Sequence, residues 1–150
     1  MNERKNPHLR ALAAITWYLA KRDHSEKELR EKMRERHTPE AIQSALDEAR
    51  ERGWLARPED LAQRVADALS RRQKSAGYIQ GYLRKKGLPQ AQLDDQTELE
   101  KAQHLLQTKL RKTANLTHEE RVKAYRWLKS RGFGDKIIRR AIYEKSNEEP

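Results

Sequence analysis

A short helical pattern recurs three times along the chain, and it constrains the fold more than any other feature of the sequence. Each copy has an apolar residue, a second apolar residue four positions later, basic residues, and then a break in the pattern. The second apolar positions, separated by 50 and 45 residues, are Met33, Leu83 and Leu128. A new helix start follows six residues after each of them, at Pro39, Pro89 and Gly134. Self-similarity with such a period is typical of repeat proteins, in which each unit packs on its neighbours.

The recurrence predicts an all-α fold of three tandem three-helix repeats, each similar to a helix-turn-helix, stacked into an elongated, curved rod. Strand signals are nearly absent, because no run of β-branched residues alternates with polar ones. Hydrophobic residues make up 35% of the chain, and its 6 glycines still leave the apolar total below the roughly 45–50% of globular domains. Such a thin core disfavours a compact enzyme with a deep buried pocket.

Capping signals locate the starts of several of the nine helices that the pattern predicts. The hydroxyl caps are Ser25, Thr38 and Thr117, and a glutamate three positions later completes a capping box at the first and last of them. A weaker helix is expected to begin at Leu88-Pro89 and to include Leu93. The polar segment 94–98 is the best boundary between units. The expected division is an N-terminal extension at 1–10, repeats at 11–56, 57–97 and 98–145, and a frayed tail at 146–150.

The charge of the chain indicates a polyanionic partner. Lys and Arg total 33 against 23 Asp and Glu, for a net charge of +10, and residues 101–150 hold 13 of the basic residues and 6 of the acidic ones. In the first third, opposite charges alternate at helical spacings, which is typical of a solvated helix face. The one-sided clusters farther along indicate binding to nucleic acid, to an acidic protein surface, or to both.

Three basic clusters form the candidate binding site. They are Arg71, Arg72 and Lys74; Arg84, Lys85 and Lys86; and Lys109, Arg111, Lys112, Arg121, Lys123 and Arg126. If the first two clusters converge, six cations meet beside Tyr78 and Tyr82. That combination suits a phosphate backbone with aromatic stacking or an acidic groove on a protein. Three other aromatic residues neighbour periodic aliphatic residues and are expected in the core: Trp17, Tyr125 and Trp127.

No catalytic residue, metal site or cofactor is expected. The five histidines are isolated in sequence and the chain has no cysteine, so no metal-ligand set is recognisable. His24 is expected to be a solvated turn residue, Gly77 a helix-entry residue, and Gly81 a point of close packing or a groove for a partner. No apolar run is long enough to span a membrane, and the charged start is unlike a signal peptide, so a cytoplasmic protein is expected.

Three segments resemble, in order, the repeat signatures of the RecX family of bacterial regulators of the RecA recombinase. They are Ala20–Leu29, Gly77–Leu88 and Trp127–Phe133, and the likeness extends over about residues 10–145. The chain departs from the family pattern between the first two repeats. Ala56-Arg57 replaces an acidic pair, Leu61 replaces an aromatic residue, and Ser75-Ala76-Gly77 replaces a Gly-aromatic-Gly segment.

The resemblance implies a non-catalytic protein made of three tandem three-helix repeats. We also expect the protein to be a monomer. Its implied partner is the RecA filament on single-stranded DNA, which RecX-like proteins bind in the helical groove. It is then a negative modulator of filament growth, ATP hydrolysis, strand exchange and co-protease activity, and acts in recombination, DNA repair and the SOS response. From the one-sided charge, the expected filament-binding and DNA-binding residues are those of the three basic clusters.

Two other functions stay open at the level of sequence. A stand-alone basic helical DNA-binding module would bind naked DNA with a steep salt dependence and would need no RecA. A basic scaffold for an acidic protein unrelated to recombination would show no DNA-linked effect.

Overall fold

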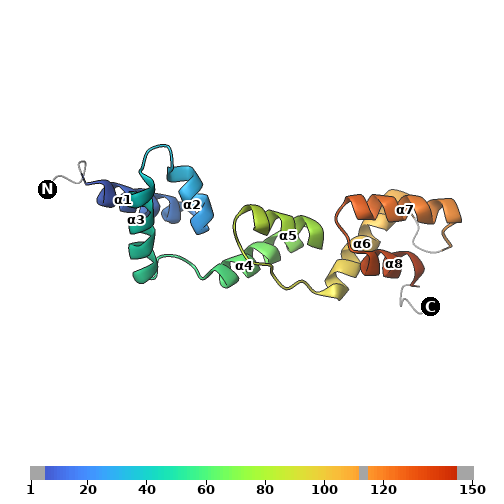
Figure 1. Ribbon diagram of the computed structural model, residues 1–150. Coiled ribbons are helices and arrows are strands. Elements are labelled where there is room, and N and C mark those ends of the chain that lie inside the picture. The colour runs from blue at the N-terminus through green and yellow to red at the C-terminus, as the bar shows by residue number, and fades with distance from the viewer. Residues whose placement is uncertain (1–5, 112–114, 145–150) are drawn as a thin grey trace. The chain divides into compact units, whose positions relative to one another are not determined.

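The protein is all-helical in the part of the chain that its computed structural model describes, residues 6–111 and 115–144. The helices shown in Figure 1 are α1 (Pro7–Lys21), α2 (Glu26–Met33), α3 (Pro39–Glu51), α4 (Pro58–Arg71), α5 (Ala76–Lys85), α6 (Asp95–Leu110), α7 (His118–Ser130) and α8 (Asp135–Tyr143). The expected class of tandem helical repeats is confirmed. None of these helices is long and apolar enough to cross a membrane.

The chain divides into two compact units, and the division passes through α4 and α5. The first unit comprises the residues up to Arg64 together with Leu83–Gln90, and the second comprises Val65–Tyr82 together with the residues from Ala91 onward. The expected rod concerns the relative placement of such units, and it stays a prediction, as do the repeat boundaries.

The core of the first unit lies among α1, α2 and α3. Its buried residues follow the helical period that the sequence shows, with Ile15, Leu29 and Leu46 fully enclosed. Both predicted starts are confirmed: the Ser25 capping box opens α2, and Thr38 caps α3. These caps satisfy backbone N–H groups that have no partner within the helix, so local chemistry places the helices before packing acts on them.

A serine hydroxyl ties α2 to the end of α5 within the first unit. Ser25 Oγ accepts from the Glu28 N–H at 3.1 Å and donates to the Lys86 carbonyl oxygen at 2.5 Å. The next residue, Gly87, has a φ of +71°, and a Cβ there would lie 2.8 Å from the Lys27 Cβ. The Ser25 hydroxyl therefore caps the start of α2 and also satisfies a backbone carbonyl group just after the end of α5.

The second unit repeats this arrangement between α5 and the turn that joins α7 to α8. Ser75 Oγ donates to the Arg131 carbonyl oxygen at 2.5 Å, and the Gly77 N–H donates to the Gly132 carbonyl oxygen at 2.9 Å. Gly132 has a φ of +97°, and a Cβ on Gly77 would lie 2.5 Å from the Gly132 oxygen. Close packing occurs at Gly77. At Gly81, where the sequence suggested close packing or a groove, a Cβ would meet nothing within 4 Å.

A buried ion pair also joins α6 to the start of α5. Lys101 is 2% exposed and Glu98 is 3% exposed, and the Lys101 ammonium donates to a Glu98 carboxylate oxygen. The same ammonium donates to the Lys74 carbonyl oxygen at 3.0 Å, and the other Glu98 oxygen accepts from the Ala76 N–H at 2.9 Å. Around this network, α6, α7 and α8 enclose an apolar core that includes Leu106, among others.

The helix expected from Leu88 to Leu93 is a wrong prediction, because this segment is not helical. The side-chain amide of Gln80 takes the place of helical bonding: its Nε2 donates to the Ala91 carbonyl oxygen at 2.8 Å, and its Oε1 accepts from the Ala91 N–H at 3.2 Å. The polar segment 94–98 begins a helix, and its place as the boundary between repeats stays a prediction. Asp94 caps α6, and the following residues form its first turn.

Candidate functional site

The first basic cluster lies at the end of α4 in the second unit. Arg71 is the last residue of the helix, Arg72 follows it, and both side chains are exposed. Gln73 has a φ of +64°, which turns the chain toward α5. The half-buried Lys74 places its ammonium 4.9 Å from the centre of the exposed Tyr78 ring. The cluster therefore combines two exposed guanidinium groups with a cation that contacts an aromatic face.

The second cluster ends α5 in the first unit, and its three cations differ. Arg84 and Lys85 are exposed, as expected, and neither forms an ion pair with a described residue. Lys86 is half-buried and lies 3.4 Å from the Glu28 carboxylate, so it serves partly as an internal partner. The first and second clusters belong to different units, and their convergence beside Tyr78 and Tyr82 stays a prediction.

Glu28 is the centre of a charged network that the sequence did not reveal as such. Its buried carboxylate accepts from the Arg22 guanidinium at 2.7 Å and from the Ser25 N–H at 3.3 Å. Burial by itself raises the pKa, but the Arg22 and Ser25 hydrogen bonds and the charges of Arg22 and Lys86 outweigh it and lower the pKa of Glu28 to about 2. The carboxylate is therefore ionised at neutral pH and holds α2 against the end of α5.

Acidification is expected to weaken the fold through Glu28. The pKa of Glu28 is about 2 in the folded chain, against an ordinary value of 4.5. Ionised Glu28 therefore stabilises the fold fully at pH values above 4.5, and this contribution is lost as the pH falls toward 2. The difference between the two pKa values limits the contribution of Glu28 to the free energy of unfolding to about 3 kcal/mol. Chemical denaturation at neutral and acidic pH should show a larger loss in the wild type than in Glu28→Gln. An equal loss in both would contradict this role.

His24 was expected to be a solvated turn residue, and this prediction is wrong, since His24 is 4% exposed. Its Nδ1 lies 2.9 Å from the Arg22 carbonyl oxygen, to which it donates, and its Nε2 accepts from the Lys32 ammonium at 3.1 Å. Burial lowers the pKa of His24, the Arg22 hydrogen bond opposes this, and the nearby Arg22 and Lys32 charges lower it further. Its ring also contacts the Tyr18 ring, with centroids 5.6 Å apart. The neutral imidazole is thus a structural part of the turn before α2.

The third cluster is spread over α6 and α7 in the second unit. Lys109 lies 4.6 Å from the centre of the Trp127 ring, and Arg111 is the exposed left-handed residue that ends α6. Lys112 lies outside the described residues. On α7, Arg121 is half-buried, whereas Lys123 and Arg126 are exposed. None of the five described members forms an ion pair with a described residue, so their charges are available to a partner.

The prediction that Trp17 belongs to the core is wrong, because 57% of its surface is exposed. The apolar face of α1 carries Leu12 and Ile15, and a residue two positions after Ile15 points about 200° away from it. The Lys21 ammonium lies 3.7 Å from the centre of the Trp17 ring. Tyr125 and Trp127 are partly buried against the second core, which is closer to the prediction.

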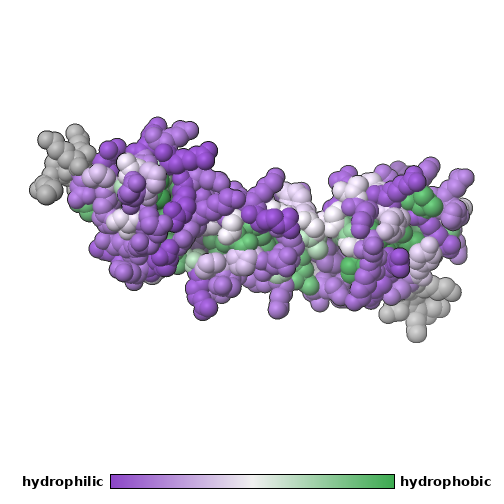
Figure 2. Space-filling model, in the orientation of Figure 1, coloured by the Kyte–Doolittle hydropathy of each residue, from purple (hydrophilic) through white to green (hydrophobic). Residues whose placement is uncertain are grey.

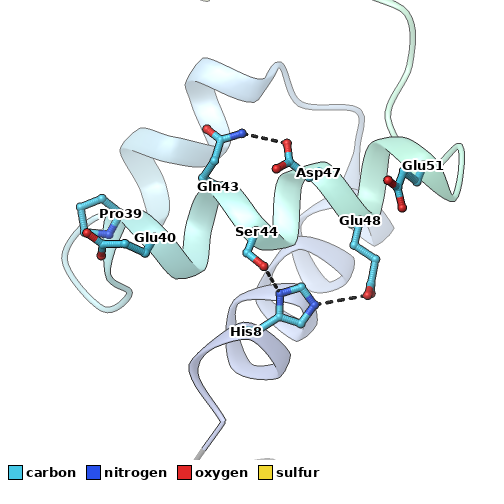
Figure 3. Close-up of a pocket in the computed structure, with 8 residues that line it drawn as sticks. All are labelled: His8, Pro39, Glu40, Gln43, Ser44, Asp47, Glu48 and Glu51. Atoms are coloured by element: carbon cyan, nitrogen blue, oxygen red, sulfur yellow. Dashed lines mark hydrogen bonds and ion pairs between the residues drawn. The ribbon is translucent and has the colours of Figure 1, made fainter.

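An open surface pocket of about 680 Å³ lies along α3 in the first unit, and four of the eight residues that line it are acidic (Figure 3). His8 bridges two of its residues, with Nδ1 2.7 Å from Ser44 Oγ and Nε2 3.3 Å from Glu48 Oε1. The set resembles a hydrolase triad in composition alone. Ser44 lies inside a helix, where backbone N–H groups already bond to carbonyls, so none is free to hold an oxyanion. The contacts instead join α1 to α3.

No group of three or more His, Asp or Glu side chains that could hold a metal ion occurs within the described ranges.

Sequence models of RecX match two stretches of this chain: the first three-helix domain matches residues 11–48, and the third three-helix domain matches residues 96–142. Together the two matches cover more than half of the chain. The chain belongs to the RecX family. This confirms the resemblance, and membership in this family of regulatory proteins suggests a regulator of RecA.

Solved RecX structures share the fold. The crystal structure of RecX from Lactobacillus salivarius has a TM-score of 0.80 and 20% sequence identity, with 92% of this chain and 96% of that chain covered. A second crystal structure, of the regulatory protein RecX, has a TM-score of 0.78 and 19% identity, with 93% of this chain and 74% of that chain covered. A search of curated proteins found no match.

Proposed function

We propose that this protein is a negative modulator of RecA that binds RecA–single-stranded-DNA filaments in their helical groove. Binding there inhibits filament growth, ATP hydrolysis, strand exchange and co-protease activity. Membership in the RecX family, through its first and third domains, is the observation that carries the proposal. The protein acts without catalysis, as a cytoplasmic monomer.

The exposed cations of the three basic clusters support binding to a polyanionic assembly. Figure 2 shows hydrophilic residues over most of the visible face, with apolar residues in small areas. Ten of the candidate cations lack an ion pair with a described residue: Arg71, Arg72, Lys74, Arg84, Lys85, Lys109, Arg111, Arg121, Lys123 and Arg126. Unpaired cations raise the association rate with an anionic partner and select against cationic ones. An acidic filament groove and the DNA within it are both partners of this kind.

The decisive experiment is DNA-dependent ATP hydrolysis by RecA, with this protein titrated at fixed salt and excess single-stranded DNA. A fall in rate at amounts well below one molecule per RecA supports a filament modulator. An effect that begins only when the DNA itself is saturated supports the alternative, a stand-alone DNA-binding module. Binding to naked DNA over a salt series completes the distinction, since a pure DNA binder shows a steep slope.

Charge reversal at the end of α5 is expected to weaken this inhibition. The variant Arg84→Glu/Lys85→Glu removes two exposed cations and leaves Lys86 with Glu28, so the fold is retained. The amount of protein needed for half-inhibition should rise by about tenfold, the effect of roughly 1.4 kcal/mol of lost interaction. Circular dichroism should be unchanged.

The matched control is Arg34→Glu/Arg36→Glu, which changes the net charge equally at the end of α2 in the same unit. These two exposed arginines belong to the mixed-charge first third, where a solvated face is expected. Similar losses from both double variants would mean that net charge, and not the α5 cluster, governs inhibition.

A further inference from the structure

A small pocket lies between the first half of α7 and the last turn of α8, within the second unit. Its volume is about 210 Å³. Val122 and Ile142 give it apolar walls, and Tyr125 and Tyr143 give it aromatic ones. The proposed filament contact draws on the charges of Arg121 and Arg126, which line this pocket, but it assigns no role to the pocket itself or to its tyrosines.

The charged residues that line the pocket are basic. Arg121 lines it with its side chain half-buried, and its Nε is buried without a hydrogen-bond partner in the described part of the chain. Buried polar atoms in proteins are nearly always hydrogen-bonded, so an unpartnered guanidinium nitrogen marks a place where an acceptor is missing. Arg126 also lines the pocket, is exposed and has no ion pair with a described residue. Among the described residues, none with an acidic side chain lines the pocket.

The aromatic residues of the pocket are set for stacking. Tyr143 is 64% exposed, and the Arg121 guanidinium lies 5.3 Å from the centre of its ring. The Tyr125 hydroxyl donates to Asp135 Oδ1 at 2.5 Å, which holds that ring in place. An exposed ring beside a guanidinium group, over an aliphatic floor, suits a flat group that is apolar on its faces and anionic at its edge.

We propose that this pocket binds one nucleobase of single-stranded nucleic acid. The base stacks on Tyr143, and the adjoining phosphates meet Arg121 and Arg126. A single strand is required because bases in a duplex are stacked on each other and cannot reach an aromatic side chain. An acidic peptide would satisfy the arginines but would leave the tyrosine ring without a flat partner. The site needs no RecA, so it goes beyond the proposed filament contact.

The test measures fluorescence anisotropy of two labelled single strands with the full-length protein, without RecA. One strand is oligothymidylate, and the other is an abasic strand of the same length and charge. Wild-type protein should bind oligothymidylate about tenfold more tightly, which is within the range of one base–aromatic stack. The variant Tyr143→Ala should lose this preference, and Tyr143→Phe should keep it.

The matched control is Trp17→Ala. Trp17 is an exposed aromatic residue with the Lys21 ammonium 3.7 Å from the centre of its ring, but it belongs to none of the three basic clusters and does not line this pocket. It should leave the preference for oligothymidylate unchanged. The proposal is overturned by equal wild-type affinity for the two strands, by a preference that survives Tyr143→Ala, or by polyglutamate binding that depends on Tyr143. Because RecA is absent, none of these results depends on the filament assay.

Discussion

Replacing Lys101 with methionine is expected to lower the free energy of unfolding by about 3–5 kcal/mol, the range found when one partner of a buried ion pair is removed. Methionine fills similar space, but the Glu98 carboxylate then stays buried with its charge uncompensated. The Lys74 carbonyl oxygen also loses the donor that lies 3.0 Å away. Denaturant unfolding followed by circular dichroism measures the loss.

Two further variants test the cause of this loss. Glu98→Gln/Lys101→Met removes both charges and should be less destabilised than Lys101→Met alone, because no unpaired charge remains buried. Lys109→Met removes an exposed lysine from the same helix and should change stability by less than about 0.5 kcal/mol. A double variant no more stable than Lys101→Met would show that the loss comes from packing and not from the stranded carboxylate.

Replacing Gly77 with alanine is expected to destabilise the second unit by about 1–3 kcal/mol, the usual cost of forcing extra volume into a packed site. The new Cβ would lie 2.5 Å from the Gly132 carbonyl oxygen and 3.0 Å from the Gly132 Cα. These are backbone atoms, so they cannot move aside as a flexible side chain can. The hydrogen bond from the Gly77 N–H to that oxygen would break as the segments separate.

Gly81→Ala on the same helix provides the opposite expectation. Its Cβ would meet nothing within 4 Å, so the substitution adds helix propensity without a clash and should stabilise by about 0.5–1 kcal/mol. Thermal unfolding of the two variants should therefore shift in opposite directions. A Gly77→Ala variant as stable as Gly81→Ala would mean that the junction of α5 with the α7–α8 turn is not closely packed in solution.

The helix starts and the apolar faces were predictable because they depend on neighbours in sequence. Ser25 with Glu28 and Thr117 with Glu120 form the predicted capping boxes, since cap and partner are three residues apart. Gly53 ends α3 in the left-handed region, and Trp54 folds back so that its N–H donates to the Ala49 carbonyl oxygen.

Two of the errors arise from contacts between residues more than one helical turn apart in the sequence. The segment from Leu88 to Leu93 lacks a helix because the Gln80 side-chain amide forms hydrogen bonds with the backbone of Ala91. No local sequence pattern predicts these hydrogen bonds. His24 is buried because it sits between the Tyr18 ring and the Lys32 ammonium. The exposed cations of the basic clusters could be predicted, because their exposure requires no partner within the chain.

The sequence by itself determined the all-helical class, most of the helix starts, and the one-sided charge that points to a polyanion, because helical period, caps and net charge are properties of short stretches. Tertiary structure alone decided which charged residues are structural and which are free. Lys101 and Lys86 look like any other lysine in the chain, yet packing places their ammonium groups on Glu98 and Glu28. Glu98 and Lys101 are three residues apart on one helix, but their burial against the segment at Lys74 and Ala76 depends on distant parts of the chain, as does the pairing of Lys86 with Glu28. That proximity arises only when the chain folds.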